Sequence, residues 1–190
     1  MLIPIAVNAQ LEVAASDDAT VLIETLIGSD VTYSNPQLVC PENGGGTFNG
    51  INSNIGLDGG ILLTTGRVNL AVGPNNNDDD GANDGQMTNQ DPDLEDIVFP
   101  FEICDNCVLE FDFEGEGSML SFTYVFGSEE YPEYFCGTFN DVFGFFITGP
   151  NPAGGTYNAE NIALILGTNL PVTINNLGPG ECHGVDNSQF

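Results

Sequence analysis

Hydrophobic and polar residues alternate along much of this chain, which is the pattern of strands with one buried and one solvated face. In residues 108–113 (VLEFDF), Leu109, Phe111 and Phe113 share a face that is opposite two acidic side chains. Residues 120–126 (LSFTYVF) repeat the arrangement, with Leu, Phe, Tyr and Phe on one face. Both segments are predicted strands whose aromatic faces pack in a core.

Most of the chain divides into such strand-length runs, which Gly, Pro and Asn separate. The predicted strands are 31–34, 47–51, 59–66, 97–103, 108–113, 118–126, 141–149, 161–166 and 171–174. One helix is expected, because Ser16-Asp17-Asp18 offers an N-cap before the amphipathic run 19–27 and Gly28 follows it. The pattern predicts an all-β fold, an antiparallel, jelly-roll-like β-sandwich with one short N-terminal helix.

An acidic loop separates the predicted strands 118–126 and 141–149. It carries Glu129, Glu130, Asn140 and Asp141, whose carboxylate and amide oxygens are of the type that Ca²⁺ prefers. The loop is therefore a candidate calcium site. The alternative is a solvated acidic loop in which Asn140-Asp141 forms an Asx-turn into the next strand.

A second acidic stretch, residues 73–96, is rich in Asn, Asp and Gly. Its candidate calcium ligands are Asp78, Asp80, Asp84 and Asp91. An EF-hand register fails, since Ala82 occupies the third position and no helices are predicted at its flanks. The stretch is either a weaker calcium site or a linker.

The net charge of -27, from 28 acidic residues against one Lys or Arg, bears on every class of partner. Nucleic acids and anionic membranes are excluded as direct partners, because they require basic residues. Disorder is also excluded, since 41% of the residues are hydrophobic and 13 are Phe. Bound cations or adaptation to a saline habitat would both account for the acidity.

Residues 1–9 (MLIPIAVNA) resemble the end of a secretory signal, with small residues at the cleavage spacing but no charged segment before them. We therefore expect a mature chain that begins near Gln10, with 10–190 as a single domain, and either a misplaced start or a fragment. No later segment is long enough and apolar enough to span a membrane.

Five cysteines in an exported chain favour disulfides over catalytic thiols. Cys136 and Cys182 both lie in loops between predicted strands, so we expect them to pair. Cys104 and Cys107 have CxxC spacing at the start of a strand, where a local disulfide is favoured over a redox or zinc site. Cys40 would then remain single.

Several motifs together carry a family resemblance. Residues 126–150, with SEEYPEY and FNDVFGFFITGP, are followed by NIALILGTNLPVTINN at 161–176 and preceded by GGILLTTG and VLEFDF in the same order. The chain resembles the choice-of-anchor L domain of secreted bacterial proteins over most of residues 20–180. The resemblance implies an extracellular β domain on proteins with various surface anchors, with further strands beyond Asn176. We therefore expect either a longer natural protein or pairing between copies through exposed strand edges.

These observations favour a non-catalytic, calcium-stabilised module for adhesion or surface assembly, with other surface proteins, copies of itself or glycans as partners. A carbohydrate-binding module is the alternative, in which Tyr131 and Tyr134 would stack on a sugar. A glycoside hydrolase with Glu129 or Glu130 and Asp141 as its carboxylate pair is less favoured, because nothing separates an acid from a nucleophile.

Overall fold

The computed structural model describes residues 10–74, 90–117, 119–132, 134–178, 180–182 and 185–186. Antiparallel strands predominate and helices are few, in agreement with the predicted all-β class. The described chain forms two compact units. Unit 1 contains residues 10–74 and 105–117, and unit 2 contains residues 90–104 and those from 119 onward.

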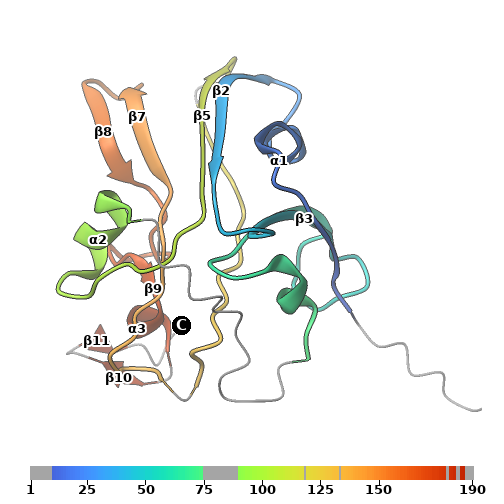
Figure 1. Cartoon of the computed structure of the whole chain (residues 1–190). Helices are drawn as coiled ribbons and strands as arrows, with labels where there is room; N and C mark the ends of the chain where they lie inside the picture. The colour runs from blue at the N-terminus through green and yellow to red at the C-terminus, as the bar shows by residue number, and fades with distance from the viewer. Residues whose placement is uncertain are drawn as a thin grey trace, which may run out of the picture. The chain divides into compact units, whose positions relative to one another are not determined.

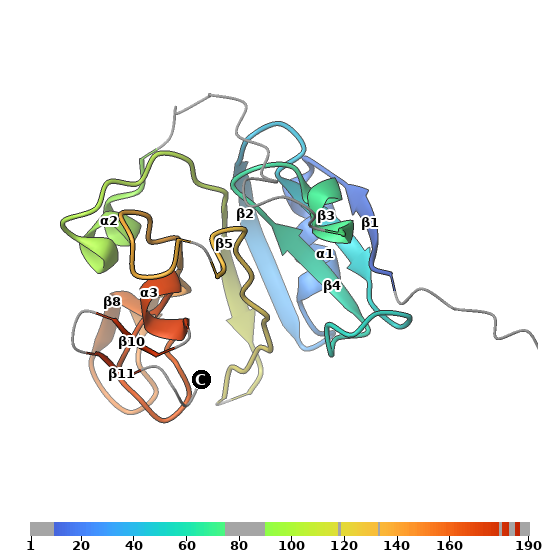
Figure 2. The same cartoon turned by 90° about the horizontal axis from the view of Figure 1, so that it is seen from below.

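Unit 1 is built on a three-stranded antiparallel sheet that helix α1 covers (Figure 2). The sheet has the order β1 (Glu12–Ala15), β3 (Gly45–Asn49) and β4 (Gly59–Leu63), and it contacts α1 (Ala19–Leu26) and the 3-10 helix η1 (Val68–Val72).

The predicted N-cap residues do begin α1, because the Thr20 amide donates to Asp18 Oδ1 at 2.9 Å. Leu22 and Ile23 point into the core and are fully buried. The helix lies close to β3, since a Cβ on Gly45 would sit 3.1 Å from Leu22 Cδ1 and 2.8 Å from the Ser16 carbonyl oxygen. A side chain at Gly45 would therefore separate helix and sheet.

A long ribbon, β2 (Val31–Val39) paired with β5 (Val108–Gly115), completes unit 1 (Figure 1). Its register shifts between Ser34 and Gln37, where Asn35 adopts a φ of 54° and the ladder has a bulge. Beyond the bulge the pairing resumes and ends with Val39 opposite Val108. The residues just past that last pair are Cys40 and Cys107, so the register brings the two cysteines together.

Unit 2 consists of short antiparallel pairs and two helices. Its elements are α2 (Pro92–Val98), β6 (Val142–Phe143), β7 (Phe146–Pro150), β8 (Thr156–Asn161), β9 (Val172–Thr173), α3 (Ile174–Leu177), β10 (Glu181–Cys182) and β11 (Val185–Asp186). The pairs are β6 with β9, β7 with β8 and β10 with β11. Val98, Ala163, Ile165, Val172 and Ile174 form its buried apolar core.

Four strand predictions need correction. The predicted strand 161–166 contributes only Asn161, the last residue of β8, because Asn161 Oδ1 accepts from the Ala163 amide at 3.0 Å and Leu164 makes only an isolated bridge to Pro171. Residues 97–103 do not form a strand, because Asp91 accepts from the Asp93 and Leu94 amides and starts α2, which ends at Val98. Residues 119–126 are in no hydrogen-bonded strand. The predicted strand 171–174 turns into α3 at Ile174, where Thr173 Oγ1 accepts from the Asn176 amide at 3.2 Å. Helices α2 and α3 are thus additions to the one predicted helix.

Candidate functional site: the loop stapled to α3

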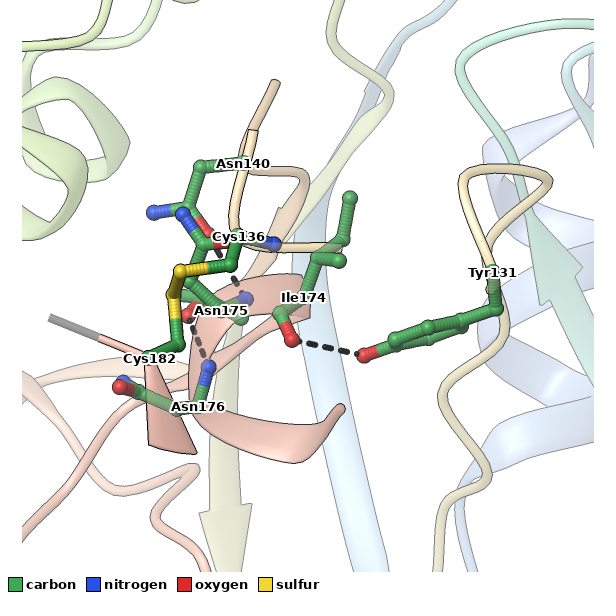
Figure 3. Close-up of a disulfide and its surroundings, with 8 residues drawn as sticks. Tyr131, Cys136, Asn140, Ile174, Asn175, Asn176 and Cys182 are labelled. Carbon is green, nitrogen blue, oxygen red and sulfur yellow. Dashed lines mark hydrogen bonds between the residues drawn. A yellow bond between two sulfur atoms is a disulfide. The ribbon is translucent and has the colours of Figure 1, made fainter. Parts of the chain in front are cut away.

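The loop that the sequence singled out is fastened to helix α3 in unit 2 (Figure 3). Asn175 lies at the centre of this attachment and is 6% exposed. Its side-chain Oδ1 accepts from the main-chain amide of Cys136 at 2.9 Å, and its main-chain amide donates to Asn140 Oδ1 at 3.1 Å. The side-chain amides of Asn175 and Asn140 thereby take the place of the main-chain hydrogen bonds that join neighbouring strands in a sheet.

Three further links hold the same loop. Cys136, with a φ of 61°, forms a disulfide with Cys182. The Tyr131 hydroxyl donates to the Ile174 carbonyl at 3.1 Å, and the Ile174 amide donates to the Asp141 carbonyl at 3.0 Å. Residues 131–141 are therefore attached to α3 at their beginning, middle and end, which makes the loop a rigid support for the side chains beside it.

The acidic groups lie at the end of this loop and just before it. The Ser128 hydroxyl donates to Asp141 Oδ2 at 2.6 Å, and the Glu130 amide donates to Ser128 Oγ at 3.1 Å. Ser128 therefore connects the two acidic residues. Among the described residues, Glu130 Oε2 is a buried atom without a hydrogen-bond partner.

The electrostatics of Glu130 follow from this arrangement. Burial raises the pKa of its carboxyl above the ordinary 4.5, and the negative charges of Asp141 and Glu129 raise it further. Either a proton or a cation would relieve the repulsion between these carboxylates.

The four calcium ligands predicted in this loop differ in their surroundings. The charges of Glu129 and Asp141 act on Glu130, whereas Asn140 Oδ1 accepts from the main-chain amide of Asn175. Within the described residues, no group of three or more His, Cys, Asp or Glu side chains is arranged to hold a metal ion. Backbone and hydroxyl oxygens would have to complete any coordination shell.

The predicted second calcium site is described only at one residue. Asp78, Asp80 and Asp84 lie outside the described residues. Asp91 is described, and its Oδ1 accepts two helix amides at 3.0 Å each, as the N-cap of α2.

The two predicted sugar-stacking tyrosines also differ. The Tyr131 hydroxyl is used internally, and burial, with a contribution from the Asp141 charge, raises its pKa to about 12. Tyr134 is 38% exposed and meets Phe139, which is 52% exposed, edge to face at a centroid distance of 5.5 Å. The loop therefore presents Tyr134 with Phe139 at its surface.

The cysteine predictions are half correct. The Cys136–Cys182 disulfide is present, but Cys107 bonds to Cys40 and leaves Cys104 as an exposed thiol. The predicted Cys104–Cys107 bond is wrong because the β2–β5 register places Cys40 opposite Cys107.

Sequence reasoning missed three contributors to the site: Ser128, Phe139 and Asn175. Only Asn175 had a visible signal, because Thr173 and Asn176 are spaced as a helix N-cap and its partner, which places the intervening Asn175 in a first helical turn. The contacts of Ser128 and Phe139 depend on how the loop folds back, and nothing in their spacing indicates it.

Among the described residues, no helix combines the length and the apolar character that a bilayer-spanning segment requires.

Comparison with known proteins gives one match. No curated protein and no solved structure matches the chain. The model of the choice-of-anchor L domain family matches residues 10–190. The chain therefore belongs to the choice-of-anchor L domain family, a non-catalytic type of surface-associated module found in secreted or surface proteins.

Proposed function

We propose that the chain is a non-catalytic adhesion or assembly module of an extracellular protein, and that Ca²⁺ stabilises the loop from Glu129 to Asp141. Family membership supports the surface role. The observation that carries the calcium proposal is Glu130 Oε2, a buried carboxylate oxygen that finds no hydrogen-bond partner in the described part of the chain and lies close enough to Asp141 for the two charges to repel.

A divalent ion would offset that repulsion and satisfy the buried oxygen in one step. Ca²⁺ accepts six to eight oxygen ligands in flexible geometry, so the side chains of Glu129, Glu130 and Asp141, with nearby hydroxyl, carbonyl and water oxygens, suit it chemically. The scaffold is already fixed by the Cys136–Cys182 disulfide and the Asn175 hydrogen bonds. Binding would therefore require little ordering of the chain.

We also propose that the strands assemble as an antiparallel, jelly-roll-like β-sandwich. Support comes from the aromatic faces in unit 2, where Phe122 stacks on Phe145 at 4.2 Å and Tyr124 packs on Phe143 at 4.9 Å. These rings belong to the faces that the alternating pattern marked as buried. An experimental structure with two facing sheets would bear this out, and a single open sheet would contradict it.

Thermal unfolding with and without Ca²⁺ tests the calcium proposal. At a hundredfold excess over Kd, binding to the folded state alone adds about 2.7 kcal/mol to the free energy of unfolding. Glu130→Gln and Asp141→Asn should each remove most of this gain. Glu110→Gln, on the exposed face of β5, is the matched control and should retain it. Sodium at equal ionic strength must stabilise less, since an equal effect would mean that screening alone is responsible.

The adhesion role has a separate test. Beads coated with the domain should adhere to the producing cells in Ca²⁺ and detach when chelator is added. Adhesion that is identical for beads coated with the domain and with an unrelated protein of equal net charge would contradict the role, whatever the calcium result.

The exposed Tyr134–Phe139 pair favours one second candidate, a carbohydrate-binding module, because aromatic rings on a rigid loop can stack on a sugar ring. A glycan array distinguishes the two candidates. Binding that Tyr134→Ala and Phe139→Ala abolish would establish the second candidate, and an array without signal would leave the adhesion module.

A further inference from the structure

The Cys136–Cys182 disulfide is attached to a closed circuit of hydrogen bonds that contains the candidate calcium site of unit 2. Half of the circuit runs through the loop itself. The Tyr134 amide donates to the Glu130 carbonyl at 2.9 Å, and the Gly137 amide donates to the Tyr134 carbonyl at 2.9 Å. Two consecutive turns therefore fix the position of Cys136 relative to Glu130.

The other half of the circuit runs through helix α3 (Figure 3). The main-chain amide of Cys136 donates to Asn175 Oδ1 at 2.9 Å, and the main-chain amide of Asn175 donates to Asn140 Oδ1 at 3.1 Å. Asn140 directly precedes Asp141, whose carbonyl accepts from the Ile174 amide at 3.0 Å. Cys136 and Asp141 are thus held on the same helix, which sets the distance between them.

Ser128 closes the circuit between the two acidic residues. Its hydroxyl donates to Asp141 Oδ2 at 2.6 Å and accepts from the Glu130 amide at 3.1 Å. The distance between the two carboxylates therefore depends on every contact around the ring, including those of Cys136, where the disulfide is attached. An ion that bridges Glu130 and Asp141 binds best when that distance is set before it arrives.

Two kinds of link hold Cys136 on α3 and on the strand that follows it. One is the hydrogen bond to Asn175, which opens in local fluctuations of the main chain. The other is the disulfide to Cys182 in β10, which persists as long as the two sulfur atoms stay oxidised. Cys182 is 2% exposed, so a reductant reaches this bond only when the loop opens. The oxidation state of the pair therefore determines how firmly the circuit is closed.

Oxidation of this cysteine pair and calcium binding should consequently favour each other. In the oxidised chain the ligands are ordered before the ion arrives. In the reduced chain the ion has to order the loop as it binds, and the lost conformational entropy lowers the affinity. By linkage, the factor by which oxidation raises calcium affinity equals the factor by which calcium stabilises the disulfide.

We propose that formation of the Cys136–Cys182 disulfide switches the loop from Glu129 to Asp141 into its calcium-binding form. This rests on the proposed calcium function and deepens it by naming a regulation of the same site. The two thiols give two protons and two electrons to a disulfide-bonded oxidant, so that one sulfur–sulfur bond forms in the chain and the oxidant's bond breaks to leave two thiols. Proteins of this family are secreted or surface-associated, where surroundings are oxidising. The chain thus acquires its calcium affinity on export.

The first experiment compares calcium affinities in the full chain. The parent carries Cys104→Ser, so that the exposed thiol cannot exchange with the disulfides. The test variant adds Cys136→Ala with Cys182→Ala, and the matched control instead adds Cys40→Ala with Cys107→Ala, which removes the disulfide of unit 1. Calorimetric titration with CaCl₂ should give a Kd at least roughly tenfold weaker in the test variant, the equivalent of ordering about one residue of main chain. The Kd of the control should equal that of the parent.

The reciprocal experiment keeps the disulfide in place, so it decides the matter even where the test variant fails to fold. The parent is equilibrated with mixtures of reduced and oxidised dithiothreitol, in saturating Ca²⁺ or in chelator. Free thiols are then alkylated, and mass spectrometry of the peptides quantifies each cysteine. Calcium should move the midpoint of Cys136–Cys182 to a more negative potential by about 30 mV for each tenfold difference in calcium affinity. The midpoint of Cys40–Cys107 should stay where it is.

The outcomes separate this inference from the calcium proposal. A loss of affinity confined to the test variant, or a midpoint shift confined to Cys136–Cys182, supports the switch. Equal affinity in the test variant and the parent, or a Cys136–Cys182 midpoint that Ca²⁺ leaves unmoved, overturns the switch and leaves the calcium proposal standing. Equal losses in both double variants also overturn it, since they would reflect general stability. A parent with both disulfides that binds no Ca²⁺ overturns the calcium proposal itself.

Discussion

The β2–β5 ribbon and the loop stapled to α3 each carry a disulfide, yet they are held in different ways. In the ribbon, main-chain pairs run on both sides of a bulge, and the Cys40–Cys107 bond lies just beyond the last pair. In the loop, main-chain bonds are few, and Cys136–Cys182 acts together with side-chain amides and a phenol. The ribbon should tolerate side-chain changes that the loop does not.

Loss of either disulfide should have the largest effect. Spans of 67 and 46 residues each correspond to about 4 kcal/mol of stability in the chain-entropy model. Cys40→Ala with Cys107→Ala should leave the β2–β5 amides protected from exchange, because the ladder remains. Cys136→Ala with Cys182→Ala should expose the amides of 131–141. Denaturant titration and amide exchange measure both, and the reverse pattern of protection would contradict the comparison.

Asn140→Ala should come next, at about 1–3 kcal/mol, because it leaves the buried Asn175 amide without its acceptor. The matched control is Asn49→Ala in unit 1, which removes two exposed hydrogen bonds, one to Glu12 and one from the Ile51 amide, and should cost less than about 0.5 kcal/mol. Equal losses of unfolding free energy in the two variants would show that the loop does not depend on its amides.

Tyr131→Phe should cost about 1 kcal/mol, since it removes one hydrogen bond and retains the packed ring. It should also remove one late-titrating phenol, because the pKa of Tyr131 is raised to about 12. Ultraviolet absorbance against pH follows that phenol. Tyr134→Phe is the control and should change neither stability nor this titration step.

The smallest effect should be a slope of stability with pH that Glu130 causes. Its folded-state pKa is raised above 4.5, so the folded protein binds more protons than the unfolded one in the window between 4.5 and the raised value. Unfolding free energy measured in chelator should therefore fall as pH rises through that window. Glu130→Gln should flatten this part of the curve and Ca²⁺ should offset the fall, whereas a curve unchanged by Glu130→Gln would contradict the assignment.

The sequence predicted the elements whose determinants are local. Alternation in residues 108–113 predicted β5, and the Asp18 cap predicted α1. Local rules failed where turn chemistry competed with periodicity. Asp91-Pro92 starts a helix just before an apolar run that suggested a strand, and Asn35-Pro36 suggested the end of a strand that continues through a bulge.

The features of the candidate site likewise separate into those that the sequence revealed and those that only the structure revealed. Its acidic residues and the Cys136–Cys182 pair were recognisable because composition and loop position are properties of the sequence. The Cys40–Cys107 bond, the place of Asn175 beside Cys136 and Asn140, and the unpartnered oxygen of Glu130 came only from the tertiary structure. Each depends on strand register or on a loop folding back over tens of residues, and no local pattern of residue types encodes that distance.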